Sequence, residues 1–305
     1  MDLLLYVPAR LLIGLAQALP LGVVARFGRF IGWMVYLVDG RHRRVAIRNM
    51  TEAFGDEMSA KEIRGLAREN FRRIGESFGS AIKTMTMKPE RIPDILEMGG
   101  VDQFRSEHED KVPVSRIFAI GHFGNFELYA RCYDLPPGAQ FATTYRGLRQ
   151  RSLDRLLAEL RRRSGCLYFE RRKDAGRLKE AMGAGGIYLG LLADQHAGDN
   201  GLRMPFLNRE CSVSAAPAVF ALRYDCPIHV VICHRTAIAR WRIVFHEPIP
   251  TQENGKPRSS EEIMRDVNAR FEEAIRRDPA NWFWVHNRWK PAKRKKLKKP
   301  EPPAE

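Results

Sequence analysis

Between residues 116 and 276 the sequence alternates short apolar runs with longer amphipathic segments, and this alternation restricts the possible folds most. Short apolar runs predict buried strands, and apolar residues at helical spacing predict helices. The expected strands are 116–120, 141–145, 166–169, 186–193, 229–233 and 241–245, and the expected helices are 149–163, 175–182, 215–224 and 260–276. Strands that alternate with helices build a largely parallel sheet with helices on its faces. We therefore expect an α/β fold.

A further helix is expected before the first strand, over residues 59–83. Ser59 and Glu62 have the spacing of a capping box, in which each side chain accepts a hydrogen bond from the backbone of the other residue. Apolar residues then recur at helical spacing from Ile63 to Phe78, and Pro89 and Pro93 interrupt the chain beyond the helix.

Residues 1–40 are strongly apolar and form a membrane-associated segment in this interpretation. Leu11 to Ala25 carries no charge, with Arg10 before it and Arg26 after it. A spanning helix needs about 20 apolar residues, so three interpretations stay open: a helix that spans or deeply enters the bilayer, a helical hairpin in the interface, and a buried core helix. A cleaved signal peptide is disfavoured because only Arg10 precedes the apolar run.

Positive charges fix the expected orientation of this segment. Arg41, Arg43, Arg44 and Arg48 follow it closely. The positive-inside rule then places residues 41–290, the expected α/β domain, on the cytoplasmic side. The five cysteines are odd in number and form no C-x-x-C pair, so we expect free thiols in a reducing compartment.

The chain is basic, with 51 Lys+Arg against 36 Asp+Glu and a formal net charge of +15. Residues 293–299 hold six of these charges, and subtracting them leaves +9 on the rest. Such an excess indicates an anionic partner such as a membrane surface, a phosphorylated substrate or nucleic acid. The tail 291–305 is expected to be disordered and to bind anionic lipid; a solvated end is the second interpretation, and nucleic acid binding is unlikely.

The hexapeptide from His122 to Glu127 carries the candidate chemistry. Positions five apart do not meet on a continuous helix, so we expect a strand over 116–120, a turn through Gly121 and Gly124, and a helix that opens near Asn125. His122 would be a general base oriented by Glu127. With no second histidine at i+4 and no Ser or Cys in the segment, the base would activate an external hydroxyl, and no metal or redox cofactor is needed.

This hexapeptide resembles the HX4D/E motif of the glycerolipid acyltransferase superfamily, in the HFGNWE form of the lipid A secondary acyltransferases, the lauroyl and myristoyl transferases of Gram-negative bacteria. Further similarity lies in the apolar N-terminus with residues 41–44, Tyr145-Arg146, Asp194-Gln195 with Pro205-Phe206, and residues 281–290. The chain departs from the family pattern at Phe126, at His196 and in its long basic tail.

The resemblance implies an acyltransferase at the cytoplasmic face of the bacterial inner membrane. The donor would be an acyl carrier protein thioester or acyl-CoA, and the acceptor a hydroxyl on a 3-hydroxyacyl chain of a lipid A precursor. Another glycolipid or an aminolipid is the first alternative acceptor, and a non-enzymatic membrane- or nucleic-acid-binding protein is the second alternative.

The resemblance also assigns substrate-binding positions to Gly124, Asn125, Arg146 and Asp194. Arg146 would bind phosphate or the developing oxyanion, although a surface arginine among many is the simpler interpretation. Asp194 ends an apolar strand, where it could be a site residue or a turn cap. Pro205-Phe206 would shape the acyl pocket or anchor a loop, and Trp282, Trp284 and Trp289 would plug the sheet or lie at a membrane interface.

Overall fold

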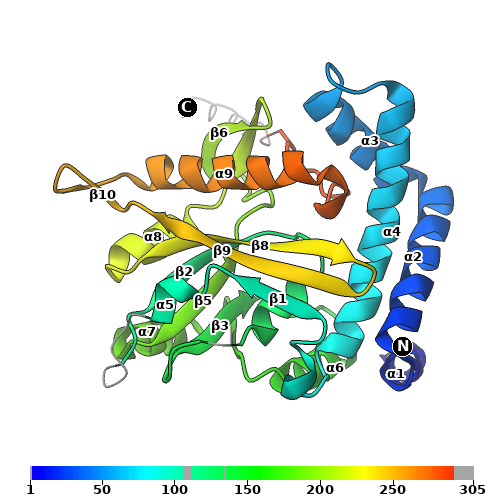
Figure 1. Cartoon of the computed structure of the whole chain (residues 1–305), viewed down its shortest axis with the longest axis horizontal. Helices are drawn as coiled ribbons and strands as arrows, with labels where there is room; N and C mark the ends of the chain where they lie inside the picture. Colours follow the sequence, from blue (N-terminus) through cyan, green and yellow to red (C-terminus); the bar gives the residue numbers. More distant parts are fainter. Residues whose placement is uncertain (1, 106–111, 134, 292–305) are drawn as a thin grey trace, which may run out of the picture.

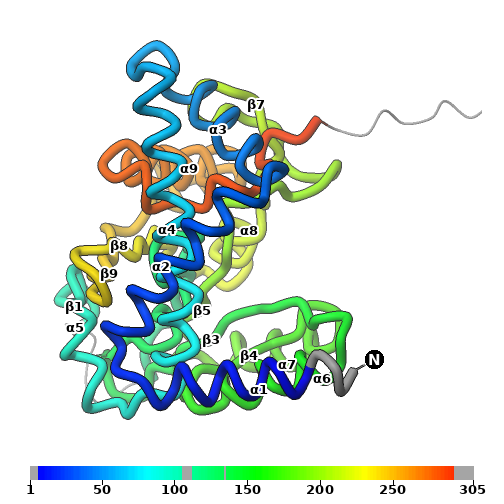
Figure 2. The backbone as a smooth tube through the Cα atoms, turned by 90° about the vertical axis from the view of Figure 1, so that its right-hand side faces the viewer, coloured from blue at the N-terminus to red at the C-terminus, as the bar shows by residue number. Residues whose placement is uncertain are grey.

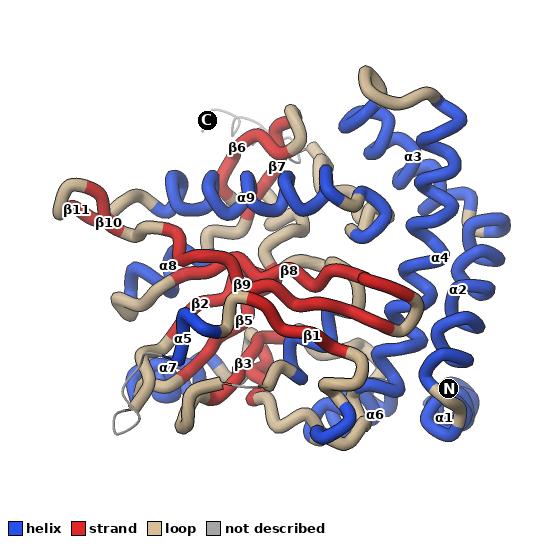
Figure 3. Tube along the Cα trace, viewed as in Figure 1, coloured by secondary structure: helices blue, strands red, loops and turns tan. Residues whose placement is uncertain are grey.

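The structure is a computed structural model that describes residues 2–105, 112–133 and 135–291. Almost all of the basic tail (292–305) lies outside the described residues. A central sheet of seven strands has the order β1-β9-β8-β2-β5-β3-β4. Figure 1 labels all of these strands except β4, and Figure 3 shows them by type of element. The strands are β1 (Leu96–Gly99), β2 (Arg116–Ile120), β3 (Gln140–Tyr145), β4 (Leu167–Glu170), β5 (Ile187–Leu192), β8 (Ile228–Ala237) and β9 (Arg240–Ile249).

The sheet is mostly parallel, as the alternating sequence predicts. β2 pairs in parallel with β5 and with β8, and β3 pairs in parallel with β5 and with β4. The exception is β9, which follows β8 through a tight turn at Ala239 and runs antiparallel to it. All six expected strands are present, whereas β1 and the hairpins β6–β7 (Leu202–Phe206 and Arg209–Val213) and β10–β11 (Gln252–Glu253 and Lys256–Pro257) were not expected.

The alternation of side chains along β2 divides the interior into two cores. Ile117 and Ala119 belong to the larger core, which is covered by α7 (Ala175–Ala184), α8 (Ala216–Arg223) and α9 (Ser260–Arg277). Phe118 and Ile120 belong to the second core, on the face of α5 (Asp102–Arg105) and the 3-10 helix η2 (Phe126–Arg131). Two more 3-10 turns, η1 (Pro89–Arg91) and η3 (Pro279–Asn281), complete the loops.

Helix α4 (Ala60–Thr84) crosses one end of the sheet, the end toward which β8 runs (Figure 1). Its N-terminus has the expected capping box, since Ser59 and Glu62 each accept from the other's backbone N–H. Asn125 Nδ2 donates to Thr84 Oγ1 at 3.2 Å and so ties the turn after β2 to the end of α4. The helix therefore forms a wall at the carboxyl ends of the parallel strands, where sheets of this class place their sites.

The apolar N-terminus forms two helices, α1 (Asp2–Ala18) and α2 (Leu21–Val38), and α3 (Gly40–Phe54) comes after them (Figure 2). α2 packs on α4 through close backbone contacts, since a Cβ atom at Gly28 or at Gly32 would overlap the backbone of α4. Its other side is exposed, so α2 is not a core helix. Among the described residues, α2 is the one helix long and apolar enough to cross a membrane.

A buried carboxylate joins three of these elements. Glu76 of α4 is fully buried and accepts hydrogen bonds from Arg29 of α2 at 3.1 Å, from Arg235 of β8 at 2.9 Å and from the backbone N–H of Ala239 at 3.0 Å. Removing one partner of such a buried pair leaves an uncompensated charge, so the cluster fixes α2 and α4 to the end of the β8–β9 hairpin.

Candidate active site

A cavity of about 870 Å³ lies at the carboxyl ends of β2, β3, β5 and β8. Its floor is apolar and includes Phe118, Phe141, Val231 and Phe245 of the second core. Helices α4 and α6 (Arg151–Arg162) supply its walls, and its lining includes the polar side chains of His122, Glu127, Arg146, Arg161 and Gln195. An apolar cavity with a few converging polar groups is the usual form of a site for a small, largely hydrophobic substrate.

The turn after β2 places His122 at this cavity, as the sequence predicts. Gly124 has φ +50° and its N–H donates to the Asn281 carbonyl oxygen at 3.0 Å, while a Cβ atom would lie only 2.8 Å from the Cys233 carbonyl oxygen. Only glycine adopts this conformation in this space without strain. Gly124, expected to bind substrate, therefore shapes the turn.

His122 is held by Asp194, which comes directly after β5, the strand next to β2. The ring Nδ1 of His122 lies 2.8 Å from Asp194 Oδ1, and the backbone N–H of His122 donates to Asp194 Oδ2 at 2.7 Å. The indole N–H of Trp282 donates to the same Oδ2 at 2.8 Å. Asp194 is 1% exposed, and these contacts occupy a carboxylate that had been expected to bind substrate.

The charge state of Asp194 determines the tautomer of His122. Burial raises the pKa of the Asp194 carboxyl, but the attraction and hydrogen bonds of His122 and the charge of Arg288 outweigh burial and lower it to about 2. An ionised carboxylate only accepts, so Nδ1 of His122 carries the proton and Nε2 of the neutral ring is free to take one. Gln195 Nε2 lies 3.4 Å from that nitrogen, at the cavity.

Glu127 has a different partner from the one expected. The 3-10 geometry of η2 directs its carboxylate toward α6, where Glu127 Oε1 accepts from Arg161 Nη2 at 2.7 Å. The expectation that Glu127 orients His122 is therefore corrected: Asp194 occupies the ring nitrogen that an orienting carboxylate would need.

Arg161 was not identified from the sequence. Its guanidinium lies against the rings of Tyr145 and Tyr168, with its carbon 5.8 Å and 5.3 Å from the ring centroids. Burial lowers the pKa of Arg161, but the attraction of Glu127 outweighs it, so that the pKa is raised. The Glu127–Arg161 pair is thus a charged, fixed element of the cavity wall. The only sequence signal near Arg161 was the leucine spacing of residues 153–160, which predicts the helix that carries it.

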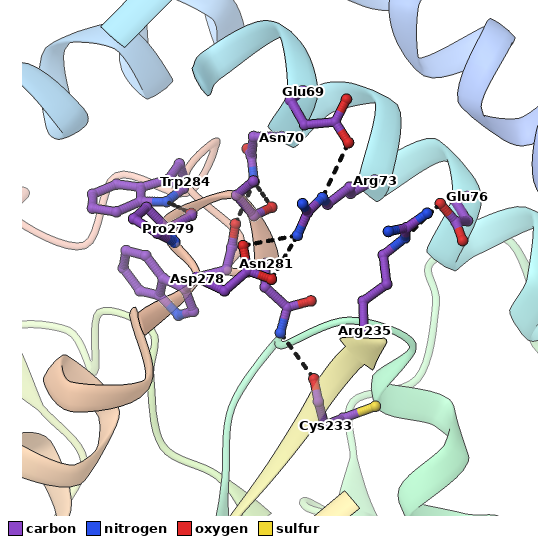
Figure 4. A network of polar contacts seen from close by, with 12 residues as sticks. Glu69, Asn70, Arg73, Glu76, Cys233, Arg235, Asp278, Pro279, Asn281 and Trp284 are labelled. Atoms are coloured by element: carbon purple, nitrogen blue, oxygen red, sulfur yellow. Dashed lines mark hydrogen bonds and ion pairs between the residues drawn. The ribbon is translucent and has the colours of Figure 1, made fainter. Parts of the chain in front are cut away.

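Polar side chains of α4 hold the segment 278–284 in place, as Figure 4 shows for Asn70, Arg73 and Asp278. Asn70 of α4 donates to the carbonyl oxygens of Ala280 and Trp282 at 3.0 and 2.6 Å. Arg73 binds Asp278 through both carboxylate oxygens at 2.8 and 2.6 Å. These contacts set the position of Trp282, whose indole N–H reaches Asp194.

Two other predicted residues differ in exposure. Arg146 is exposed and lines the cavity, so it is placed to contact a substrate. Asn125 is 1% exposed, and its side chain bonds to Thr84, which makes it mainly a link between the turn and α4. Of the four predicted binding residues, only Arg146 is therefore exposed at the cavity. The other three hold the turn or the His122 ring in position: Gly124, Asn125 and Asp194.

The aromatic cluster at the C-terminal end of the domain is part of the core. Trp282, Trp284 and Trp289 are at most 7% exposed. Phe206 packs against Trp282 with the ring centroids 5.7 Å apart, and its carbonyl accepts from the Trp289 indole at 3.0 Å. Phe206 is thus a core anchor in β6 and lies outside the residues that line the cavity.

Within the described part of the chain, no group of three or more His, Cys, Asp or Glu side chains is arranged to hold a metal ion. All five cysteines are free, as the sequence predicts. The chemistry accessible to these residues is proton transfer at Nε2 of His122, beside an apolar cavity.

A comparison with protein families matches this arrangement to one of them. The model of the bacterial lipid A biosynthesis acyltransferases matches residues 5–291, which includes the sheet, the His122 turn and the C-terminal aromatic segment. The chain belongs to the bacterial lipid A biosynthesis acyltransferase family. A search of curated proteins gave no match. The apolar floor of the cavity agrees with membership of this family, because an acyltransferase must hold an acyl chain.

Proposed function

We propose that this protein transfers a fatty acyl chain from a carrier thioester to a hydroxyl of a lipid A precursor, with His122 as general base. The observation that carries the proposal is the His122–Asp194 pair, in which Nδ1 of His122 lies 2.8 Å from the buried carboxylate and the ring lines the cavity. Nε2 takes the proton of the acceptor hydroxyl as its oxygen attacks the thioester carbon. The carbon–sulfur bond then breaks, and the carrier thiol leaves with a proton.

Each described residue has a defined part in this proposal. Asp194 holds the tautomer of His122 and stabilises the imidazolium that forms. Arg146 lies at the cavity, where a guanidinium can bind phosphate on the acceptor or on the carrier. Glu127 and Arg161 keep a fixed charged wall beside the reaction centre. The apolar floor holds the acyl chain.

The donor is an acyl carrier protein thioester, with acyl-CoA as the alternative, because a basic surface favours an acidic carrier. The reaction takes place at the cytoplasmic face of the inner membrane, where the arginines after residue 40 would keep the domain. Another glycolipid or an aminolipid remains the alternative acceptor, since the base and cavity specify the transfer more closely than the acceptor.

The test is transfer by the purified protein from acyl-ACP and from acyl-CoA to a lipid A precursor, read by mass spectrometry of the lipid. The wild type should add one acyl chain, and His122→Ala should reduce the rate by at least about 100-fold while keeping its unfolding temperature. Full activity of the His122 variant would refute the base assignment. Acylation of other lipids but not of the lipid A precursor would move the acceptor to the alternative.

A further inference from the structure

Helices α1 and α2 form an apolar layer on one side of the molecule, the side that faces the viewer in Figure 2. Large apolar side chains project outward from both helices, and several are about half exposed or more. They include Leu11 and Leu12 of α1 and Phe27, Phe30 and Val38 of α2. An exposed apolar surface of this kind marks a contact with a partner or with lipid.

Helix α2 of this layer packs against α4 along the whole length of α2. Gly28 of α2 faces the backbone of Gly75, and Gly32 faces the backbone of Phe71, so the two helices touch without intervening side chains. Farther along, the Tyr36 hydroxyl reaches the Arg64 carbonyl oxygen at 3.5 Å. α2 therefore has α4 as its neighbour from one end to the other.

A row of arginines on α4 runs beside this contact. Arg64, Arg68 and Arg72 are exposed and recur every fourth residue, so they share one side of the helix. Guanidinium groups are costly in hydrocarbon. If α2 crossed the bilayer, α4 would have to carry this row into the hydrocarbon with it.

The same arginines have the position expected at a membrane surface. Arg72 of α4 and Arg26 of α2 line a hollow of about 260 Å³ together with Phe30 and Trp33. Cations beside amphipathic aromatic rings are typical of the boundary between headgroups and acyl chains. The apolar layer thus matches the acyl chains of one leaflet of anionic lipid, and the arginine row matches the headgroups of that leaflet.

We propose that α1 and α2 lie flat in a single leaflet of an anionic phospholipid bilayer, with Arg64, Arg68 and Arg72 at the level of the lipid phosphates. Helix α2 then enters the membrane on its side and does not cross it. This orientation deepens the proposed function, on which it rests for the lipid acceptor. Because α4 and α6 line the cavity, and α2 and α1 pack on them, the acceptor reaches His122 laterally from the same leaflet.

The first test labels the two ends of α2 with a membrane-impermeant maleimide. Pro20→Cys and Arg41→Cys place a thiol just before and just after the helix, at exposed positions. In inverted membrane vesicles both variants should react above the background of the parent, and in right-side-out vesicles neither should. A Pro20→Cys variant that reacts only from the opposite face, or only after detergent, would overturn the proposal.

The second test reverses the arginine row. The triple variant Arg64→Glu, Arg68→Glu, Arg72→Glu is compared with Lys179→Glu, Arg223→Glu, Lys256→Glu, which makes the same change in formal charge on α7, α8 and β11, at the other end of the molecule (Figure 1). Partitioning into phosphatidylglycerol vesicles should fall about 10-fold or more for the first variant and much less for the second. Equal losses would show that net charge alone determines binding and would overturn the proposed surface.

Neither test measures catalysis. Failure of the proposed membrane orientation is therefore distinguishable from failure of the proposed function. Labelling from both faces would contradict the flat orientation and leave acyl transfer intact. Correct labelling with no transfer activity would contradict the proposed reaction alone.

Discussion

Asp194 keeps its charge although it is buried, because three hydrogen-bond donors converge on its two oxygens. A buried carboxylate without them would be protonated near neutral pH and could not fix the His122 ring. The donors come from residues 122 and 282, so the charge depends on two segments that are distant in the chain. At the scale of single residues, the arrangement of the proposed base is therefore a product of tertiary contacts.

Replacing the two carboxylates separately tests which of them serves the base. Asp194→Asn should lower kcat by roughly 10²- to 10⁴-fold, because the amide offers an N–H to His122 and favours the wrong tautomer. Glu127→Gln should cost less, since it weakens the ion pair with Arg161 and leaves His122 oriented. Steady-state kinetics with one donor and acceptor decide, and a larger loss for Glu127→Gln would return the orienting role to it.

Gly190 of β5 lines the cavity beside Ile120, so a larger side chain there occupies space for the acyl chain. Gly190→Val should reduce kcat/KM for long acyl donors more than for short ones. Gly183→Val, at an exposed glycine of α7, is the control and should leave the ratio unchanged. A uniform loss for donors of every length would show that the chain does not reach Gly190.

At the scale of elements, α2 and α4 behave as one unit. They approach through backbone atoms at Gly28, Gly32 and Gly75, and the buried Glu76 cluster joins them to β8. Helix α2 is therefore part of the folded domain, because its removal would leave Glu76 with one fewer cationic partner.

A matched pair of glycine substitutions tests this packing. A Cβ atom at Gly32 would lie 2.1 Å from the Phe71 carbonyl oxygen, whereas one at Gly14 of α1 meets nothing within 4 Å. Gly32→Ala should lower the free energy of unfolding by about 1–3 kcal/mol, because the helices must separate. Gly14→Ala should leave it unchanged or raise it by up to about 1 kcal/mol through helix propensity. Denaturant unfolding in detergent measures both, and equal effects would contradict the close contact.

At the scale of the whole molecule, local patterns in the sequence predict much of the fold but little of the site's pairing. Strand β2 has the predicted bounds, 116–120, and the cap at Ser59 depends on two residues only. The partner of His122 depends on which strand lies next to β2, and this order of strands is a long-range property. The sequence shows that His122 follows one buried strand and that Asp194 follows another. Had the two strands been known to be neighbours, a contact between these residues would have been predicted.

The stability of the whole molecule should also depend on pH through its buried histidines. Burial lowers the pKa of His229 to about 4, against a value near 6.5 for an exposed histidine, and Arg116 adds repulsion. The unfolded chain therefore binds more protons between these values, so stability is complete above pH 6.5 and falls toward pH 4, by roughly 3 kcal/mol for this residue.

His229→Gln should flatten this decline, and His42→Gln, at an exposed histidine, should not. Urea unfolding between pH 7 and pH 4.5 provides the measurement. An unchanged slope in His229→Gln would mean that His229 takes up its proton in the folded state at an ordinary pH.

The dependence of Asp194 on Trp282 has a consequence for the order of synthesis. The ribosome produces His122 and Asp194 long before residue 282, so the nascent chain contains both members of the pair before the indole that fixes them. A chain that stops before η3 would carry the whole hexapeptide and the complete sheet, yet Asp194 would lack one of its donors. Translation of the last segment therefore completes the hydrogen bonds that hold Asp194.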